Sequence, residues 1–231
     1  MRKIILCCLF FVFINAYSMV SNPIDWDKAV DRAIIQYGLK TEPELKLFFR
    51  QAHVAYPPKQ IALLAFKKEK ELQLWAKNKN WHHIHTYPFT ASSGYLGPKL
   101  REYDLQIPEG IYELTGFNPY SQMHLSMKIN YPNAFDQAKA AEEGRKKMGG
   151  DIFLHGKAQS VGCLAVGNHA IDQLFMLSRR VGLEHVQLII APNDLRRGKP
   201  KTKRQTQPDW LPELYEHIES KLEAFPLKEQ V

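Results

Sequence analysis

Residues 151–163 read Asp-Ile-Phe-Leu-His-Gly-Lys-Ala-Gln-Ser-Val-Gly-Cys, and the rest of the chain is best interpreted outward from this stretch. Its apolar residues 152–155 are typical of a short buried strand. A strand, a tight turn and a returning segment can bring residues eight positions apart side by side. The two glycines of the stretch permit such a sharp turn. The sequence therefore predicts that His155 lies beside Cys163.

The other two cysteines, Cys7 and Cys8, lie in a segment that resembles a removable secretion signal. In an exported chain, Cys163 would have no disulfide partner. An unpaired thiol in an oxidising compartment is a liability unless its reactivity is used. A histidine, a hydroxyl group and a glycine close to a thiol are the parts of a thiol acyl-transfer enzyme. The alternative is a buried cysteine that behaves as a small hydrophobic residue.

The N-terminus has the three-part pattern of a secretory signal. Arg2 and Lys3 precede an apolar run from Ile4 to Ala16, and small residues follow at the positions that a signal peptidase reads. The run is shorter than the roughly 20 residues of a membrane-spanning helix. We therefore expect residues 1–18 to be a signal peptide and the mature chain to have no stable membrane span. An uncleaved anchor is the alternative.

The composition favours one globular domain with an anionic partner. The chain has 231 residues, of which 45% are hydrophobic, and its formal net charge is +7. A mature chain of this length can bury a sizeable core. Outside the cytoplasm, a positive charge points to cell-wall peptide, polysaccharide or anionic lipid, and it disfavours nucleic acid as a partner. The sequence has no phosphate-binding glycine loop or dinucleotide fingerprint, so we expect no cofactor.

The predicted strands cluster along the chain instead of alternating with helices. Strands are expected over 61–66, 71–76, 81–87, 107–112, 124–130, 152–155 and 185–191, and helices over 23–39, 41–49, 170–181 and 208–225. The clustering favours an α+β fold built on a mainly-β sheet or sandwich. We expect an N-terminal helical segment over 19–60 and a catalytic domain over 61–231, with a helix after the cysteine and another at the C-terminus.

The residues around Cys163 suggest how the thiol would react. A thiol must become a thiolate to attack a carbonyl carbon, and His155 is the nearest candidate to take its proton. The backbone amides of Gly162 and Cys163 could bind the resulting oxyanion. Ser160 could orient the imidazole or bind the substrate.

These motifs resemble the L,D-transpeptidase catalytic domain, the YkuD-like fold. His155-Gly156 followed by Ser160-x-Gly162-Cys163 is similar to the active-site box of that family. The resemblance extends over about residues 61–190 and includes 97–99 and 104–112. Segments 117–119, 124–126 and 130–136 resemble the branch found in the periplasm of Gram-negative bacteria. That branch includes peptidoglycan meso-diaminopimelate protein amidases, which release a wall-bound lipoprotein.

The resemblance implies Cys163 as nucleophile, His155 as base, and the amides of Gly162 and Cys163 at the oxyanion. It implies a periplasmic enzyme whose partners are peptidoglycan stem peptides, with or without an attached lipoprotein. Two residues depart from the commoner form of the box: Val161 stands in place of a histidine and Ala165 in place of an arginine.

Loss of that arginine removes a fixed cation for a substrate carboxylate. Water should then compete better with an amine acceptor. The resemblance to the periplasmic branch implies that the hydrolysed bond is an amide at meso-diaminopimelate, such as a protein–peptidoglycan link. The alternatives are an L,D-transpeptidase, which would form 3→3 cross-links or attach protein to the wall, and a non-catalytic wall-binding module.

Several other residues have two interpretations each. His83 and His85 would share one face of a regular strand, at the spacing of two zinc ligands, but no acidic or cysteine residue nearby completes a set. A half-exposed polar strand face is the simpler interpretation, and we expect no metal.

His124 could contribute to the substrate site or be a core histidine. Tyr131 and Asn133 could line the substrate groove or belong to a helix cap and turn.

The segment 196–204 is rich in arginine and lysine. It is either a solvated loop or a surface attracted to acidic wall polymer.

Overall fold

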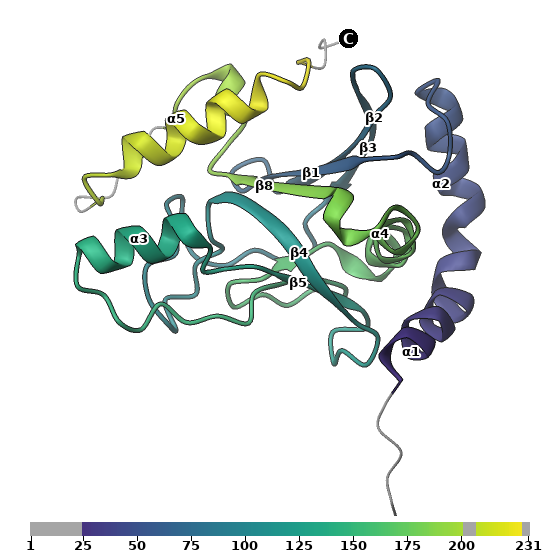
Figure 1. Cartoon of the computed structure of the whole chain (residues 1–231), viewed down its shortest axis with the longest axis horizontal. Coiled ribbons are helices and arrows are strands. Elements are labelled where there is room, and N and C mark those ends of the chain that lie inside the picture. Colours follow the sequence, from purple (N-terminus) through teal and green to yellow (C-terminus); the bar gives the residue numbers. More distant parts are fainter. Residues whose placement is uncertain (1–24, 201–206, 228–231) are drawn as a thin grey trace, which may run out of the picture.

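The computed structural model describes residues 25–200 and 207–227, so the expected signal peptide over 1–18 lies outside the described residues. One curled sheet organises the chain, with helices inside and outside the curl (Figure 1). The architecture is α+β, as the clustering of strands predicted.

The sheet has eight strands in the order β3-β2-β1-β8-β4-β5-β6-β7. Their bounds are β1 Ile61–Phe66, β2 Glu71–Lys77, β3 Trp81–Pro88, β4 Gly110–Asn118, β5 Ser126–Ile129, β6 Phe153–His155, β7 Leu164–Ala165 and β8 Val186–Ala191. Strands β1 and β8 are parallel, as are β6 and β7, and the other pairs are antiparallel.

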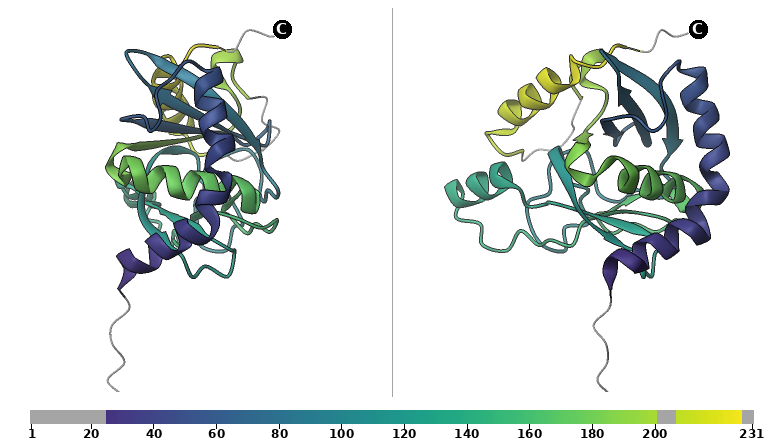
Figure 2. Two further views of the ribbon diagram at one scale, coloured as in Figure 1. Left: turned by 90° about the vertical axis from the view of Figure 1, so that its right-hand side faces the viewer. Right: turned by 45° about the vertical axis from the view of Figure 1, so that its right-hand side comes forward.

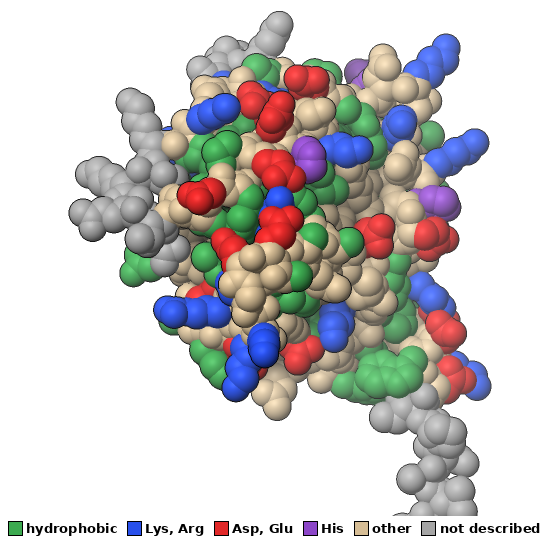
Figure 3. All heavy atoms as spheres, turned by 60° about the vertical axis from the view of Figure 1, so that its left-hand side comes forward, with side chains coloured by type: hydrophobic (Ala, Val, Ile, Leu, Met, Phe, Trp, Pro, Cys, Tyr) green, Lys and Arg blue, Asp and Glu red, His purple; other side chains and the backbone are tan. Residues whose placement is uncertain are grey.

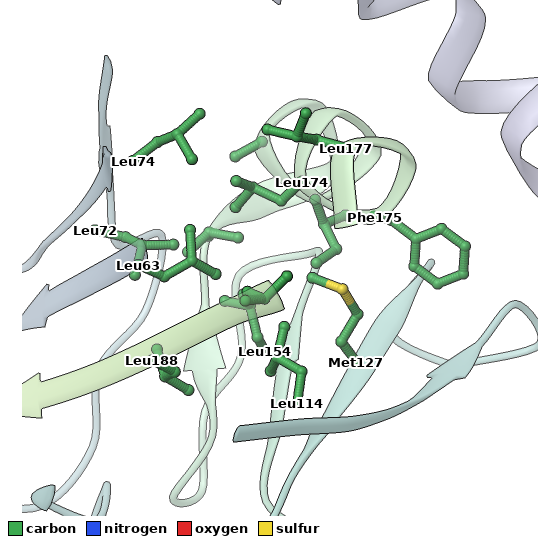
Figure 4. Packing of buried hydrophobic residues seen from close by; sticks show 14 of the residues in the cluster. Leu63, Leu72, Leu74, Leu114, Met127, Leu154, Leu174, Phe175, Leu177 and Leu188 are labelled. Atoms are coloured by element: carbon green, nitrogen blue, oxygen red, sulfur yellow. The ribbon is translucent and has the colours of Figure 1, made fainter. Parts of the chain in front are cut away.

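Strands β1 and β8 are apolar on both faces because a helix covers each face. Alternate residues of a strand point to opposite sides of a sheet. Leu63 and Leu188 accordingly join the larger buried cluster with helix α4 (Gly167–Val181), whereas Leu64 and Ile189 join a second cluster with helix α5 (Leu211–Leu222). Figure 4 shows leucines of the strands meeting Leu174 and Leu177 of α4.

The N-terminal helices form one nearly unbroken run. Helix α1 (Trp26–Ala33) begins after the N-cap Asp25, whose side chain accepts from the amide of Lys28. A π-helix (Ile34–Gly38) joins it to α2 (Leu39–Gln51). The helix expected over 41–49 is present as α2, which begins two residues earlier than expected. The Thr41 hydroxyl donates to the Gly38 carbonyl inside the run instead of capping a new start.

This helical run passes alongside α4, as the two views of Figure 2 show. Gly38 permits the close approach, because a Cβ atom there would lie 2.9 Å from Cβ of Met176 on α4. Glu44 of α2 contacts His169 and accepts from Gln173 Nε2 at 3.0 Å, and both of these residues belong to α4. The helix that follows Cys163 is thus held from the N-terminal side as well as by the sheet.

The structure corrects the expected orientation of the histidines on β3. A β-bulge interrupts the register, so that Leu74 pairs with His85 and Trp75 with His83. His85 stacks on Phe48 of α2, whereas His83 contacts Trp75, which packs in the cluster under α5. The two imidazoles therefore do not form the shared face that a regular strand would give. The described residues contain no group of three metal-ligating side chains.

No helix among the described residues has the length and apolar character needed to cross a membrane.

Candidate active site

The segment that was expected to bring His155 and Cys163 together forms a small parallel strand pair. His155 ends β6, and Cys163 directly precedes β7. Leu154 pairs with Leu164 and His155 with Ala165, so the chain returns beside itself within ten residues. His155 and Cys163 both line a pocket of about 550 Å³.

The imidazole of His155 is oriented by the main chain. Its Nδ1 lies 2.6 Å from the Gly156 carbonyl oxygen. A carbonyl oxygen can only accept, so Nδ1 must donate and carry the proton. This fixes the tautomer and leaves the lone pair on Nε2. Burial lowers the pKa of His155 below its ordinary value, because a desolvated imidazolium is disfavoured.

The thiol of Cys163 is partly buried. Burial raises the pKa of Cys163, and the backbone amide of Phe153 and the charge of Lys99 oppose that rise less strongly. The thiol lies 3.8 Å from the Asp151 carbonyl oxygen, to which it can donate. The lowered pKa of His155 and the raised pKa of Cys163 both favour the uncharged forms of the two groups.

A hydrogen-bonded loop holds Cys163 in place. The Ser160 hydroxyl donates to the Cys163 carbonyl oxygen at 2.8 Å and lies 3.0 Å from the Ser93 hydroxyl. The Gly162 amide donates to the Ser93 oxygen at 2.8 Å. Gly162 has φ +118°, and a Cβ atom there would lie 3.0 Å from the Gln106 carbonyl oxygen, so glycine is required at this position.

The Gly162 amide, one of the two donors expected at the oxyanion site, already has a hydrogen-bond partner. The Gly162 amide would have to exchange Ser93 for a substrate oxygen before it could stabilise an oxyanion. Ser160 lines the pocket, but its hydroxyl is used to shape the loop.

The pocket beside the thiol has a neutral lining. Besides His155 and Cys163 it is lined by Asn118, Ser121, Gln122, Met123, Ser126, Phe153, Gln159, Ser160 and Val161. No lysine or arginine occurs among these described lining residues. A substrate in this pocket would be recognised by amide and hydroxyl groups and by apolar contact.

Comparison with known proteins identifies the family. Residues 61–182 match the YkuD family, the L,D-transpeptidase catalytic domain. The chain belongs to this family. YafK of Escherichia coli K12, named as a candidate L,D-transpeptidase, is 34% identical over 118 residues, which are 50% of this chain and 46% of YafK. The protein of the same name from strain O157:H7 aligns equally well. The chain thus spans about half the length of these relatives.

Solved structures of lower identity also align. The helical cell shape determining protein Pgp2 of Campylobacter jejuni, in its K307A form, has 22% identity and a TM-score of 0.48, covering 60% of this chain and 49% of its own. Bd1075 of Bdellovibrio bacteriovorus has 24% identity and a TM-score of 0.41, covering 58% of this chain and 48% of its own. L,D-transpeptidase 1 of Mycobacterium tuberculosis has 10% identity and a TM-score of 0.34, covering 57% of this chain and 62% of its own.

The two departures from the commoner family box occupy different environments. Val161 is 74% exposed at the rim of the pocket. Ala165 is fully buried in β7, where it also bridges to Ala91. An arginine side chain at position 165 would need space that this packing does not provide.

Three of the expected substrate-binding residues do not line this pocket. His124 lies 2.6 Å from Asp172 of α4 and packs against Tyr37 of the π-helix. The Tyr131 hydroxyl is 3.2 Å from the Lys99 carbonyl oxygen and is buried. Asn133 caps helix α3 (Ala134–Glu142) in a reciprocal capping box with Asp136. Asn133 thus belongs to a helix cap, and His124 is a half-buried histidine in contact with Asp172 and Tyr37.

The structure also adds residues that the sequence did not single out as site residues. Ser93 supports the Gly162 amide from 69 positions away, and no local pattern links the two. Gln122 and Gln159 line the pocket from loops, where polar residues are ordinary. Asn118 lies in a segment that resembled the family, and that resemblance was the available signal.

Proposed function

We propose that the chain is a cysteine acyl-transfer enzyme that hydrolyses an amide at meso-diaminopimelate in peptidoglycan stem peptides, such as a protein–peptidoglycan link. The observation that carries the proposal is that Cys163 and His155 line one pocket, with the imidazole lone pair left on Nε2 by the bond from Nδ1 to the Gly156 carbonyl. Family membership supports peptidoglycan as the substrate class.

In the proposed reaction, Sγ of Cys163 attacks the amide carbonyl carbon while Nε2 of His155 accepts the thiol proton. The oxyanion collapses, the C–N bond breaks, and the imidazolium gives its proton to the leaving amine. Water then attacks the thioester with Nε2 as base. This step releases a carboxylic acid and restores the thiol.

The neutral lining of the pocket supports hydrolysis over transfer to an amine. No described lining residue offers a cation to hold the carboxylate of an acceptor stem peptide beside the thioester. Water needs no such anchor. We further propose that residues 1–18 direct the chain to the periplasm, where this substrate is found.

The test is digestion of purified sacculi, with and without attached lipoprotein, followed by mass spectrometry of the released peptides. Cys163→Ser is the matched control, since it changes a single atom of the nucleophile. Release of protein with free stem peptide is the expected result. A majority of 3→3 cross-linked dimers, when donor and acceptor peptides are both in excess, would assign a transpeptidase instead. Sacculus binding without any turnover would assign a wall-binding module.

A further inference from the structure

A second pocket of about 520 Å³ is strongly basic. It is lined by Pro98, Leu100, Arg101, Asp104, Gln106, Arg145, Lys146 and Lys147. Four of these eight residues are lysine or arginine, whereas the described lining of the Cys163 pocket contains none. The two pockets therefore differ in the charge of the ligand that each can accept.

The positive charge of this pocket is only partly neutralised. Asp104 is committed to Lys99 at 2.7 Å and accepts from three backbone amides, and Arg145 pairs with Glu143. Arg101, Lys146 and Lys147 are exposed, and the described residues place no carboxylate in an ion pair with them. Figure 3 shows basic side chains lying beside acidic ones on the side of the molecule that carries α3 and α5.

Gln106 provides a buried donor at the same pocket. The residue is 2% exposed, and its Oε1 accepts from the Tyr95 amide at 2.9 Å. Its Nε2 is buried and has no hydrogen-bond partner. An unpaired buried donor is costly, and an acceptor supplied by a ligand would satisfy it.

Both walls of the basic pocket continue into the Cys163 loop. The Gln106 carbonyl oxygen lies close to Gly162, beside the nucleophile: a Cβ atom at that position would be 3.0 Å from it. From Lys147 the chain runs to Asp151, whose carbonyl oxygen lies 3.8 Å from the thiol. Four residues span at most about 14 Å, which is also the reach of an extended peptide of four residues.

We propose that this basic pocket binds a carboxylate of the peptide whose amide is cleaved at Cys163. The inference rests on the proposed function and adds a second point of attachment to it. Lysine and arginine side chains would hold the carboxylate at the surface, and Gln106 Nε2 would donate to it from the wall. The neutral pocket would bind the amide that is cleaved, and the basic pocket would bind the carboxylate of the same peptide.

The test measures peptide affinity in a Cys163→Ala background, where nothing is turned over. The probes are a synthetic stem tetrapeptide with free carboxylates and the same peptide with carboxamides. The variant Arg101→Gln/Lys146→Gln/Lys147→Gln should weaken binding of the free-carboxylate peptide by about tenfold, as expected for loss of charge-assisted hydrogen bonds. Binding of the carboxamide peptide should not change.

Two further variants make the result specific. Arg50→Gln/Lys79→Gln/Lys221→Gln removes the same net charge from residues that line neither pocket, and it should leave both affinities unchanged. Gln106→Glu keeps an acceptor for the Tyr95 amide but places a negative charge in the wall. It should weaken binding of the free-carboxylate peptide only.

The binding results test the basic pocket independently of whether the enzyme has the proposed hydrolase activity. Equal affinity for both peptides in every variant overturns the inference, even if the active enzyme cleaves sacculi. A tenfold loss in the triple variant supports it, even if no cleavage is found. Loss of binding to phosphatidylglycerol vesicles, with peptide affinity unchanged, would overturn the peptide assignment and make the pocket a membrane contact.

Discussion

The centre of the curled sheet and its β7 edge are built in different ways. The central strands β1 and β8 share six consecutive residue pairs, and every residue of β1 is buried. At the β7 edge, β6 has three residues and β7 has two, and the intervening loop is shaped by hydrogen bonds from Ser160 and to Ser93. The centre is stabilised by apolar contact over long strands. The β7 edge positions two reactive side chains through short strands and loop hydrogen bonds. Substitutions should therefore separate stability from turnover according to the region in which they lie.

The largest effect should come from the nucleophile. Cys163→Ala should reduce release of peptide from sacculi by about 10⁴-fold or more, because covalent catalysis is lost entirely. The melting temperature should change little, since the substitution removes one partly buried sulfur atom from the β7 edge. Turnover by mass spectrometry and thermal unfolding check the two halves of this prediction. Appreciable residual turnover would contradict the thiol mechanism.

The second largest effect on turnover should come from the general base, His155. His155→Ala should lower turnover by about 10²–10⁴-fold, the usual contribution of a general acid–base group. In the unaltered enzyme, activity should fall as pH drops through the lowered pKa of His155, because protonated Nε2 cannot accept the thiol proton.

The acidic limb of the kcat/KM profile should therefore lie below the ordinary value for histidine, which is 6.5. His124→Gln is the matched control. It removes a histidine that contacts Asp172, and the pH at which activity is half lost should not move.

At the centre of the sheet, the effect should fall on stability. Leu188→Ala should reduce the free energy of unfolding by about 2–5 kcal/mol, because Leu188 is fully buried in the cluster under α4. Turnover per folded molecule should stay the same. Urea denaturation with an unchanged slope would measure the loss, and Leu188→Met, which nearly conserves volume, should cost less than about 1.5 kcal/mol. A large loss of turnover in the folded protein would mean that the centre of the sheet and the β7 edge are coupled.

The smallest change should come from the loop that supports the thiol. Ser93→Ala removes the acceptor for the Gly162 amide and should cost about 1 kcal/mol of stability. Turnover should fall as well, because the thiol and base need close alignment, and Ser93→Thr should restore part of it by returning a hydroxyl group. Rates measured at a temperature where both variants are fully folded provide the check. A variant that loses stability but keeps full turnover would show that this bond does not position Cys163.

The same contrast explains what could be predicted from the sequence. The hairpin of β1 and β2, strand β8 and helix α4 follow from strong apolar patterns, and the structure confirms them. Strand β7 has only two residues, too few for any periodicity to appear. Helix α3 was expected only as a cap and turn, since just Asp136 and Ala140 of its nine residues are buried and no apolar stripe marks it.

The remaining differences arise from contacts that are distant in the sequence. The π-helix places Gly38 against Met176, and no pattern within residues 34–38 specifies that neighbour. The bulge in β3 depends on its register with β2, so alternation alone placed His83 and His85 wrongly on one face. In the site, the local segment was enough to predict the His155–Cys163 neighbourhood, whereas Ser93 required the folded chain.

The bond from His155 to the Gly156 carbonyl has a consequence for the robustness of the site. A carboxylate that orients a catalytic histidine can be lost by a single substitution, and it loses its negative charge when it is protonated. A peptide carbonyl has neither weakness, since every residue type carries one and it does not titrate in the range where proteins function. The partner that orients this imidazole is therefore part of the backbone of the turn and does not depend on the identity of any side chain. Only a change in the path of the backbone between β6 and the Cys163 loop could remove it.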